Sequence, residues 1–144
     1  MFLLFISLPG YQLNYSNLHK LLDTFDSPNH GLTFCSGSLG ANPDNDLIDI
    51  INTFSSRIHF AHVRNLKLYD NGSFMETSHL MSDGSLDIPG IVRALYESEF
   101  SGYLRPDHGR DIWDENSRPG YGLYDRALGA MYLRGLWDSS VNLK

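Results

Sequence analysis

Apolar residues recur at helical spacing in four stretches of this sequence. In the first two, 17–25 and 45–54, leucines, isoleucines and a final phenylalanine stand at positions i, i+3, i+4 and i+7. This spacing places them on one face of a helix, so each stretch predicts an amphipathic helix with that face buried. Asn42 followed by Pro43 is a plausible start for the second of these helices.

The other two helical stretches lie in the second half of the chain. Residues 87–100 follow the pattern from Asp87 onward, and Asp87 is a potential N-cap. The last helix is expected within residues 122–137. Its predicted buried face consists of Leu123, Ala127, Ala130, Met131 and Leu136.

Three short apolar runs are typical of buried strands, because β-branched, aromatic and aliphatic residues fill them. They alternate with the helical stretches, and this order predicts a parallel sheet with right-handed crossovers. A long excursion, residues 65–86, follows the second run, and Asn71 and Gly72 within it favour a hairpin. The three runs are GLTFC at 31–35, IHFAH at 58–62 and GYLRPD at 102–107.

Each predicted strand ends in a residue that can bind a metal ion: Cys35, His62 and Asp107. Functional sites in parallel α/β folds form at the carboxyl ends of strands, and thiolate, imidazole and carboxylate are all metal ligands. Cys35 and His62 alone each have an ordinary core explanation, whereas Asp107 is costly to bury without a partner. Taken together, the three residues indicate a metal or catalytic site about as strongly as a purely structural role. Strand alternation puts His59 on the opposite face from His62, so we expect His59 to be packed or helix-facing.

Length and charge narrow the possible functions. The chain has 144 residues, which suits one domain over 1–144, and its formal net charge of −6 argues against general nucleic-acid binding. Its single cysteine excludes an intrachain disulfide framework and suits a reducing cytoplasm. The apolar start MFLLFISLPG is too short to span a bilayer, so we expect it to be core or a ragged start, and expect no membrane partner.

Five segments occur in order along the chain: GLTFCSGSLGANPDND, IHFAHVRN, FMETSHL, LRPDHG and RPGYGLYDRALGAMYLRGL. Together they give the sequence a specific resemblance, over residues 17–136, to the mannonate dehydratase family. The resemblance implies the C-terminal portion of a (β/α)8 TIM barrel of the xylose-isomerase-like kind, incomplete in this chain. It also implies metal-dependent dehydration of D-mannonate to 2-keto-3-deoxy-D-gluconate in hexuronate (glucuronate) catabolism.

The resemblance assigns roles to five residues of this sequence. Cys35, His62 and Asp107 match metal ligands of the family, and the metal that it implies is Mn²⁺ or Fe²⁺, although thiolate and imidazole alone would favour zinc. His108 and Tyr121 match the two acid/base groups. Such a dehydration needs two of them, because a proton next to a carboxylate is removed while a β-hydroxyl leaves.

Three further residues are candidates for substrate binding. Arg105 and Arg64 could support an anionic substrate, and His79 either contacts the substrate or belongs to a solvated loop. We expect a small-molecule sugar-acid substrate and a homo-oligomer.

Two alternatives to an active mannonate dehydratase remain open: another metal-dependent sugar isomerase or epimerase of the same barrel type, and an inactive truncated fragment. The family carries an upstream histidine in an His-Pro-Asp-Asp motif, which this sequence lacks. We therefore expect an incomplete metal site, negligible activity and self-association from the 144-residue chain alone.

Overall fold

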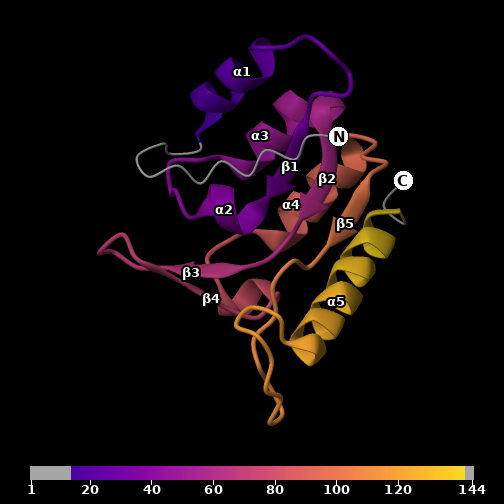
Figure 1. Ribbon diagram of the computed structural model, residues 1–144. Coiled ribbons are helices and arrows are strands. Elements are labelled where there is room, and N and C mark those ends of the chain that lie inside the picture. The colour runs from indigo at the N-terminus through magenta and orange to yellow at the C-terminus, as the bar shows by residue number, and fades with distance from the viewer. Residues whose placement is uncertain (1–13, 142–144) are drawn as a thin grey trace.

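Three parallel strands form the central sheet of the computed structural model, which describes residues 14–141 (Figure 1). The strands are β1 (Leu32–Cys35), β2 (Ile58–His62) and β5 (Tyr103–Arg105), in the order β1-β2-β5. This confirms the predicted α/β arrangement with a parallel sheet. The segment MFLLFISLPG lies outside the described residues.

All four predicted helices are present, and helical segments alternate with the strands of the sheet. In the part of the chain that the structure describes, no helix combines the length and apolar character needed to cross a bilayer. Three short helical segments accompany the four longer helices. The four are α1 (Tyr15–Asp23), α3 (Leu47–Phe54), α4 (Ile88–Glu97) and α5 (Leu123–Val141), and the short ones are α2 (Ser36–Gly40), η1 (Ser55–Arg57) and η2 (Met81–Asp83).

The start of α3 differs from the expectation. The helix does not begin at Asn42 and Pro43 but at Leu47, because Asp46 supplies the N-cap and its side chain accepts hydrogen bonds from two backbone N–H groups of the first turn. The prediction for α4 was right: Asp87 caps it and accepts from the backbone N–H of Gly90 at 3.0 Å.

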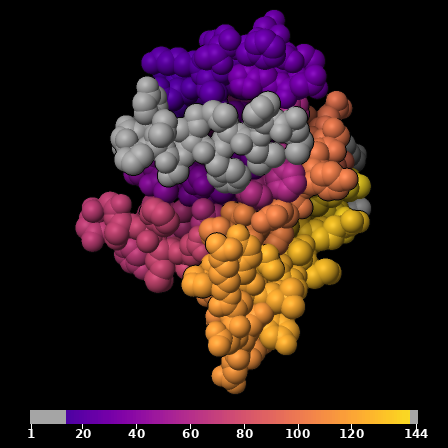
Figure 2. Space-filling view, in the orientation of Figure 1, coloured from indigo at the N-terminus to yellow at the C-terminus, as the bar shows by residue number. Residues whose placement is uncertain are grey.

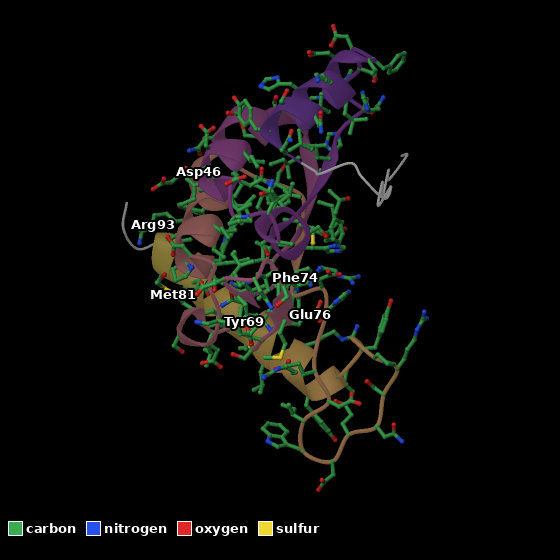
Figure 3. All side chains as sticks on the ribbon, turned by 90° about the vertical axis from the view of Figure 1, so that its left-hand side faces the viewer. Asp46, Tyr69, Phe74, Glu76, Met81 and Arg93 are labelled. Carbon is green, nitrogen blue, oxygen red and sulfur yellow. The ribbon has the colours of Figure 1, made fainter. Side chains whose placement is uncertain are left out.

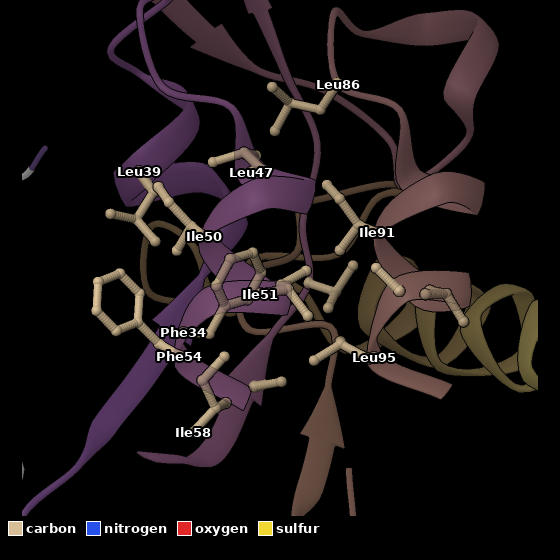
Figure 4. Close-up of a cluster of buried hydrophobic side chains, with 14 of the residues drawn as sticks. Phe34, Leu39, Leu47, Ile50, Ile51, Phe54, Ile58, Leu86, Ile91 and Leu95 are labelled. Carbon is tan, nitrogen blue, oxygen red and sulfur yellow. The ribbon is translucent and has the colours of Figure 1, made fainter. Parts of the chain in front are cut away.

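The two faces of the sheet have different roles. Phe34 and Ala61 are fully buried on the face that packs against helices α3 and α4 (Figure 4). Cys35, His62 and Arg105 are register partners across the three strands and therefore share the opposite face at the carboxyl end of the sheet. The core cluster includes Phe34, Leu39, Leu47, Ile50, Ile51, Phe54, Ile58, Ala61, Leu86, Ile91, Leu95 and Leu133.

His59 is exposed, so the expectation of a packed or helix-facing histidine was wrong. His59 does lie on the opposite face of β2 from His62, as strand alternation predicts. A Cβ on Gly31 would lie 2.4 Å from the ring of His59, so the imidazole covers the backbone at the start of β1.

The buried face of α5 also differs from the prediction. Leu123 is 60% exposed and Met131 is 71% exposed, whereas Asp125, Gly129 and Leu133 are buried. Contacts with residues outside the helix, rather than the spacing of apolar residues along it, determine which face of α5 is buried. The carboxylate of Asp125 is one such contact, because it accepts three hydrogen bonds from Arg110.

The predicted hairpin is confirmed within the excursion after β2. Strands β3 (Leu66–Leu68) and β4 (Phe74–Glu76) pair antiparallel, and Gly72 in the connecting turn has φ +79°. The fully buried Asn65 fixes the base of the excursion. Its amide donates to the carbonyl of Leu80, and its side-chain oxygen accepts from the backbone N–H groups of Leu66 and Leu86.

Residues 110–121, between β5 and α5, project from the body of the molecule (orange in Figure 2). Two backbone hydrogen bonds close the base of this projection: Gly109 N–H donates to Gly120 O at 3.0 Å and Gly122 N–H donates to Gly109 O at 2.9 Å. A Cβ on Gly109 would lie 2.4 Å from the carbonyl oxygen of Gly122, so this close approach requires glycine.

We expect Asp125→Asn to lower the free energy of unfolding by about 1 to 2 kcal/mol at neutral pH, since it weakens charged hydrogen bonds to a partly exposed guanidinium. Burial alone would raise the pKa of Asp125, but the hydrogen bonds from Arg110 outweigh burial and hold that pKa below its ordinary value. The stabilisation is therefore present above about pH 4 and is lost as the pH falls through the lower folded-state pKa.

Urea unfolding of both proteins at about pH 7 and about pH 3 measures this difference. The control is Asp138→Asn, which removes a carboxylate from the same helix and breaks the exposed pair with Arg134, and should change little. Equal effects of the two substitutions, or an Asp125 effect that grows in acid, would contradict the analysis.

Candidate functional site

Three side chains that can bind a metal ion converge at the carboxyl end of the sheet. One ligand atom each of Cys35, His62 and Asp107 lies within 4.8 Å of the others. Cys35 and His62 end neighbouring strands in register, and both are almost completely buried, at 5% and 7% exposure. The sequence prediction that the three side chains meet is therefore confirmed as geometry.

Asp107 reaches this cluster by an unexpected route. Strand β5 ends at Arg105, so Asp107 lies two residues beyond the strand rather than at its last position. Its backbone has φ +65°, a left-handed conformation that few residues other than glycine adopt, although Asp is among those that tolerate it. The carboxylate lies 3.4 Å from His62 Nδ1 and 3.9 Å from Cys35 Sγ.

The surroundings of His62 favour a neutral imidazole. Burial lowers the pKa of His62 below its ordinary value, Asp107 opposes this shift, and the nearby guanidinium groups of Arg105 and Arg64 reinforce it. A neutral imidazole keeps the nitrogen lone pair that metal binding requires.

Two hydrogen-bond donors of Ser38 lie beside the sulfur of Cys35. The backbone N–H of Ser38 donates to Cys35 Sγ at 3.4 Å, and the hydroxyl of Ser38 donates at 3.2 Å. These bonds arise because the Gly-rich segment after β1 forms the short helix α2, with Cys35 as its N-cap.

Arg64 joins the cluster to a carboxylate that sequence reasoning missed. Its Nε lies 3.1 Å from Asp107 Oδ2, and its Nη1 pairs with Glu76 Oε1 at the end of β4. The backbone of Arg64 is held on both sides by the hydroxyl of Ser36, at 2.6 and 2.8 Å. Gly37 leaves room for the guanidinium, because a Cβ there would lie 2.5 Å from its central carbon.

His108 lies against the same glutamate. Its Nδ1 is 2.5 Å from Glu76 Oε1, and its Nε2 is 3.7 Å from Asp107 Oδ2. Figure 3 labels Glu76 where the β3–β4 hairpin meets the segment after β5. Glu76 belongs to the FMETSHL segment, but its partners depend on how the hairpin folds back, and no local sequence signal reveals them.

The remaining candidates are placed differently. Arg105 is half exposed and its Nη2 lies 3.3 Å from Asp107 Oδ1, so it borders the cluster. His79 is 4% exposed and hydrogen-bonds the carbonyl of Pro106 through Nε2 at 2.9 Å, so it does not belong to a solvated loop.

Tyr121 sits next to His108 through its backbone. Gly109 and Tyr121 form an isolated parallel bridge, and a Cβ on Gly120 would lie 3.6 Å from His108 Nδ1. The ring of Tyr121 is half exposed and lies between two guanidinium groups, with Arg118 at 5.2 Å and Arg126 at 5.6 Å from its centroid.

The three-residue cluster has nearly the size of a metal site. Protein ligands lie about 2.0 to 2.3 Å from an ion such as zinc, so two ligands of one ion are at most about 4.6 Å apart. The 4.8 Å span of the cluster is slightly wider than this limit, so a small inward shift of the side chains would let all three reach one ion. The fold and this cluster define an α/β chain with a candidate metal centre at the carboxyl ends of parallel strands.

The chain belongs to the D-mannonate dehydratase (UxuA) family, whose model matches residues 4–144. It is 59% identical over 132 residues to mannonate dehydratase 1 of Bacillus licheniformis, covering 92% of this chain and 36% of the relative. It is 58% identical over 135 residues to mannonate dehydratase 1 of Halalkalibacterium halodurans, covering 94% of this chain and 37% of the relative.

A solved structure gives the same result. The crystal structure of mannonate dehydratase from Streptococcus suis serotype 2 matches with a TM-score of 0.85 and 38% identity, covering 90% of this chain and 38% of that chain. The chain thus spans a little over a third of the length of the relatives that it matches.

Substitution of two glycines in α5 tests whether His79, which hydrogen-bonds the carbonyl of Pro106 directly before Asp107, packs against this helix. A Cβ on Gly129 would lie 2.5 Å from His79 Nδ1, whose ring is fixed by the Pro106 carbonyl, whereas a Cβ on Gly135 meets nothing within 4 Å. We expect Gly129→Ala to destabilise the fold by about 1 to 3 kcal/mol through overpacking. Gly135→Ala should stabilise it by about 0.5 to 1 kcal/mol, because alanine is the better helix former.

Denaturant unfolding of the two variants beside the unaltered chain gives both numbers. The substitutions are chemically identical and share one helix, so helix propensity cancels between them. Stabilisation by Gly129→Ala equal to that by Gly135→Ala would show that His79 does not press on the helix.

Proposed function

We propose that this chain is part of a metal-dependent dehydratase that converts D-mannonate to 2-keto-3-deoxy-D-gluconate in hexuronate catabolism. The described residues would contribute three parallel strands to a (β/α)8 barrel. The observation that carries the proposal is the convergence of Cys35, His62 and Asp107 with His108 beside them, in a member of the D-mannonate dehydratase family.

Cys35, His62 and Asp107 would hold the metal ion, and Mn²⁺ or Fe²⁺ is the ion that the family resemblance favours. The set mixes a soft thiolate with imidazole and carboxylate, which suits a first-row transition metal better than Mg²⁺ or Ca²⁺. When bound, the ion supplies Lewis-acid stabilisation of the negative charge that develops on a sugar-acid substrate.

Proton transfer falls to His108 and Tyr121. The reaction takes a proton from the carbon next to the substrate carboxylate and releases the β-hydroxyl with a second proton as water, and the remaining enol rearranges to the ketone. One group accepts the first proton and the other donates the second. His108 is half exposed beside the ligand carboxylate and Tyr121 is adjacent through Gly109, so both are accessible to a substrate at the strand ends.

The arginines have separate tasks in this proposal. Arg105 is half exposed at the border of the cluster, so its guanidinium is available to an incoming carboxylate. Arg64 is already paired with Asp107 and Glu76, so it mainly orients these two carboxylates. His79 supports the backbone at Pro106 instead of binding substrate.

A chimera tests the proposal, with this chain replacing the matching segment of the Bacillus licheniformis relative, to which it is 59% identical. We expect it to form the keto acid from D-mannonate, to stop when a chelator removes the metal and to recover with Mn²⁺ or Fe²⁺. His108→Asn should lower turnover by about 10²- to 10⁴-fold while metal content stays the same. The control His59→Asn changes an exposed histidine outside the site and should keep turnover.

Three results would contradict the proposal. Isomerisation of the sugar acid without loss of water would favour an isomerase, and equal loss of metal and turnover in His108→Asn would make His108 a ligand. High activity of the 144-residue chain by itself would also disagree, because the described sheet has three of the eight strands of a barrel and we expect negligible activity from it.

A further inference from the structure

Glu76 is a charged residue of the site to which the proposed mechanism gives no role. It lies at the end of β4, on a hairpin that leaves the sheet after β2, yet its carboxylate reaches residues that follow β2 and β5. One oxygen, Oε1, is the partner of both Arg64 Nη1 and His108 Nδ1. The hairpin thus delivers a single acceptor to two groups beside the candidate metal ligands.

We propose that Glu76 is a positioning residue that fixes His108 as the tautomer with its proton on Nδ1, so that Nε2 is the nitrogen that exchanges protons with substrate. The inference rests on the proposed function for the proton-transfer role of His108. Glu76 acts through His108 and does not itself touch substrate.

The two ring nitrogens of His108 have different surroundings. Nδ1 is 2.5 Å from a carboxylate oxygen, which is hydrogen-bonding distance, and an ionised carboxylate can only accept. Nδ1 must therefore carry the proton in the neutral ring. Nε2 is 3.7 Å from Asp107 Oδ2, too far for a hydrogen bond, so it points toward the metal-ligand carboxylate without being bound by it.

Arg64 keeps Glu76 where this arrangement needs it. Its guanidinium spans the two carboxylates, with Nη1 on Glu76 and Nε 3.1 Å from Asp107 Oδ2. Its backbone is held by hydrogen bonds to Ser36 and its side chain lies against Gly37, so the bridge is anchored to α2 and to the segment directly after β2 rather than to the exposed hairpin. When a carboxylate accepts a hydrogen bond from one ring nitrogen of a histidine, as Glu76 does from Nδ1 of His108, it fixes both the orientation of the ring and the tautomer.

In this arrangement the excursion after β2 carries Glu76 to the strand ends, next to His108. Asn65 and Gly84 lock the base of the excursion, since a Cβ on Gly84 would lie 2.2 Å from the Asn65 side-chain oxygen. The antiparallel pair Leu66 with Glu76 then fixes the last residue of β4 over the strand ends. The site thus draws its second carboxylate from outside the parallel sheet.

The test uses the 144-residue chain and nitrogen NMR of its six histidines, with the His108 signals assigned by their loss in His108→Gln. In the neutral ring, the nitrogens of His108 should show a proton on Nδ1 and none on Nε2. Glu76→Leu removes the acceptor at similar size and should give a mixture of tautomers. Glu76→Gln keeps an acceptor oxygen, should fold like the parent, and should retain the tautomer.

Metal binding and turnover separate positioning from general damage. Mn²⁺ affinity of the chain should be the same in Glu76→Leu as in the parent, and turnover in the chimera should fall by about 10- to 100-fold with KM within about twofold. Asp70→Asn, an exposed carboxylate at the turn of the same hairpin, is the matched control and should change none of these.

The proposal is overturned if the parent chain carries the His108 proton on Nε2, or if Glu76→Leu leaves the tautomer unchanged. It is also overturned if Glu76→Leu loses metal in proportion to turnover, because Glu76 would then support the ligands. If the parent chimera fails to dehydrate D-mannonate, the proposed function falls, whereas the NMR result still decides the role of Glu76.

Discussion

The carboxylate of Asp107 is the group on which the whole site depends. Its Oδ1 lies 3.4 Å from His62 and 3.3 Å from Arg105, and its Oδ2 lies 3.1 Å from Arg64 and faces Cys35 and His108. A largely buried carboxylate is costly without such partners. Its left-handed backbone adds a further cost, and the turn at this residue accompanies a carboxylate that lies against Cys35 and His62 at the ends of β1 and β2.

Elements far from the site hold that turn in place. The carbonyl of Pro106, directly before Asp107, is hydrogen-bonded by His79, and the ring of His79 packs closely against the backbone of α5 at Gly129. Beyond Asp107, Arg110 binds the buried Asp125 on the same helix. The segment that carries Asp107 and His108 is therefore attached to α5 on both sides, and the long last helix serves the site as well as the core.

Sequence periodicity was sufficient wherever a contact is local. The presence and order of the three strands, α4 with its cap Asp87, and the hairpin at Gly72 follow from patterns within a few residues, and these were predicted correctly, although β5 ends two residues before the predicted end at Asp107. The convergence of Cys35 and His62 was also predictable, because the carboxyl ends of neighbouring parallel strands must meet.

Contacts between distant segments could not be predicted in this way. The buried face of α5 was wrong because the helix carries apolar residues around its circumference, and Asp125 and Gly129 face inward only through Arg110 and His79. Glu76 was missed because its partners, Arg64 and His108, are 12 and 32 residues away and meet it only when the hairpin folds back.

The most direct test of the claim that Cys35, His62 and Asp107 form one metal site is the binding of Co²⁺ to the 144-residue chain. A thiolate bound to cobalt gives a charge-transfer absorption, and Cys35 is the single cysteine of the sequence, so this absorption reports on Cys35. The account predicts this absorption at one equivalent of metal, its loss in Cys35→Ser, and much weaker binding in both His62→Asn and Asp107→Asn, while His59→Asn binds normally. Unchanged affinity in His62→Asn and Asp107→Asn would show that cobalt binds the thiol alone, and the three side chains would then be neighbours without being ligands of one ion.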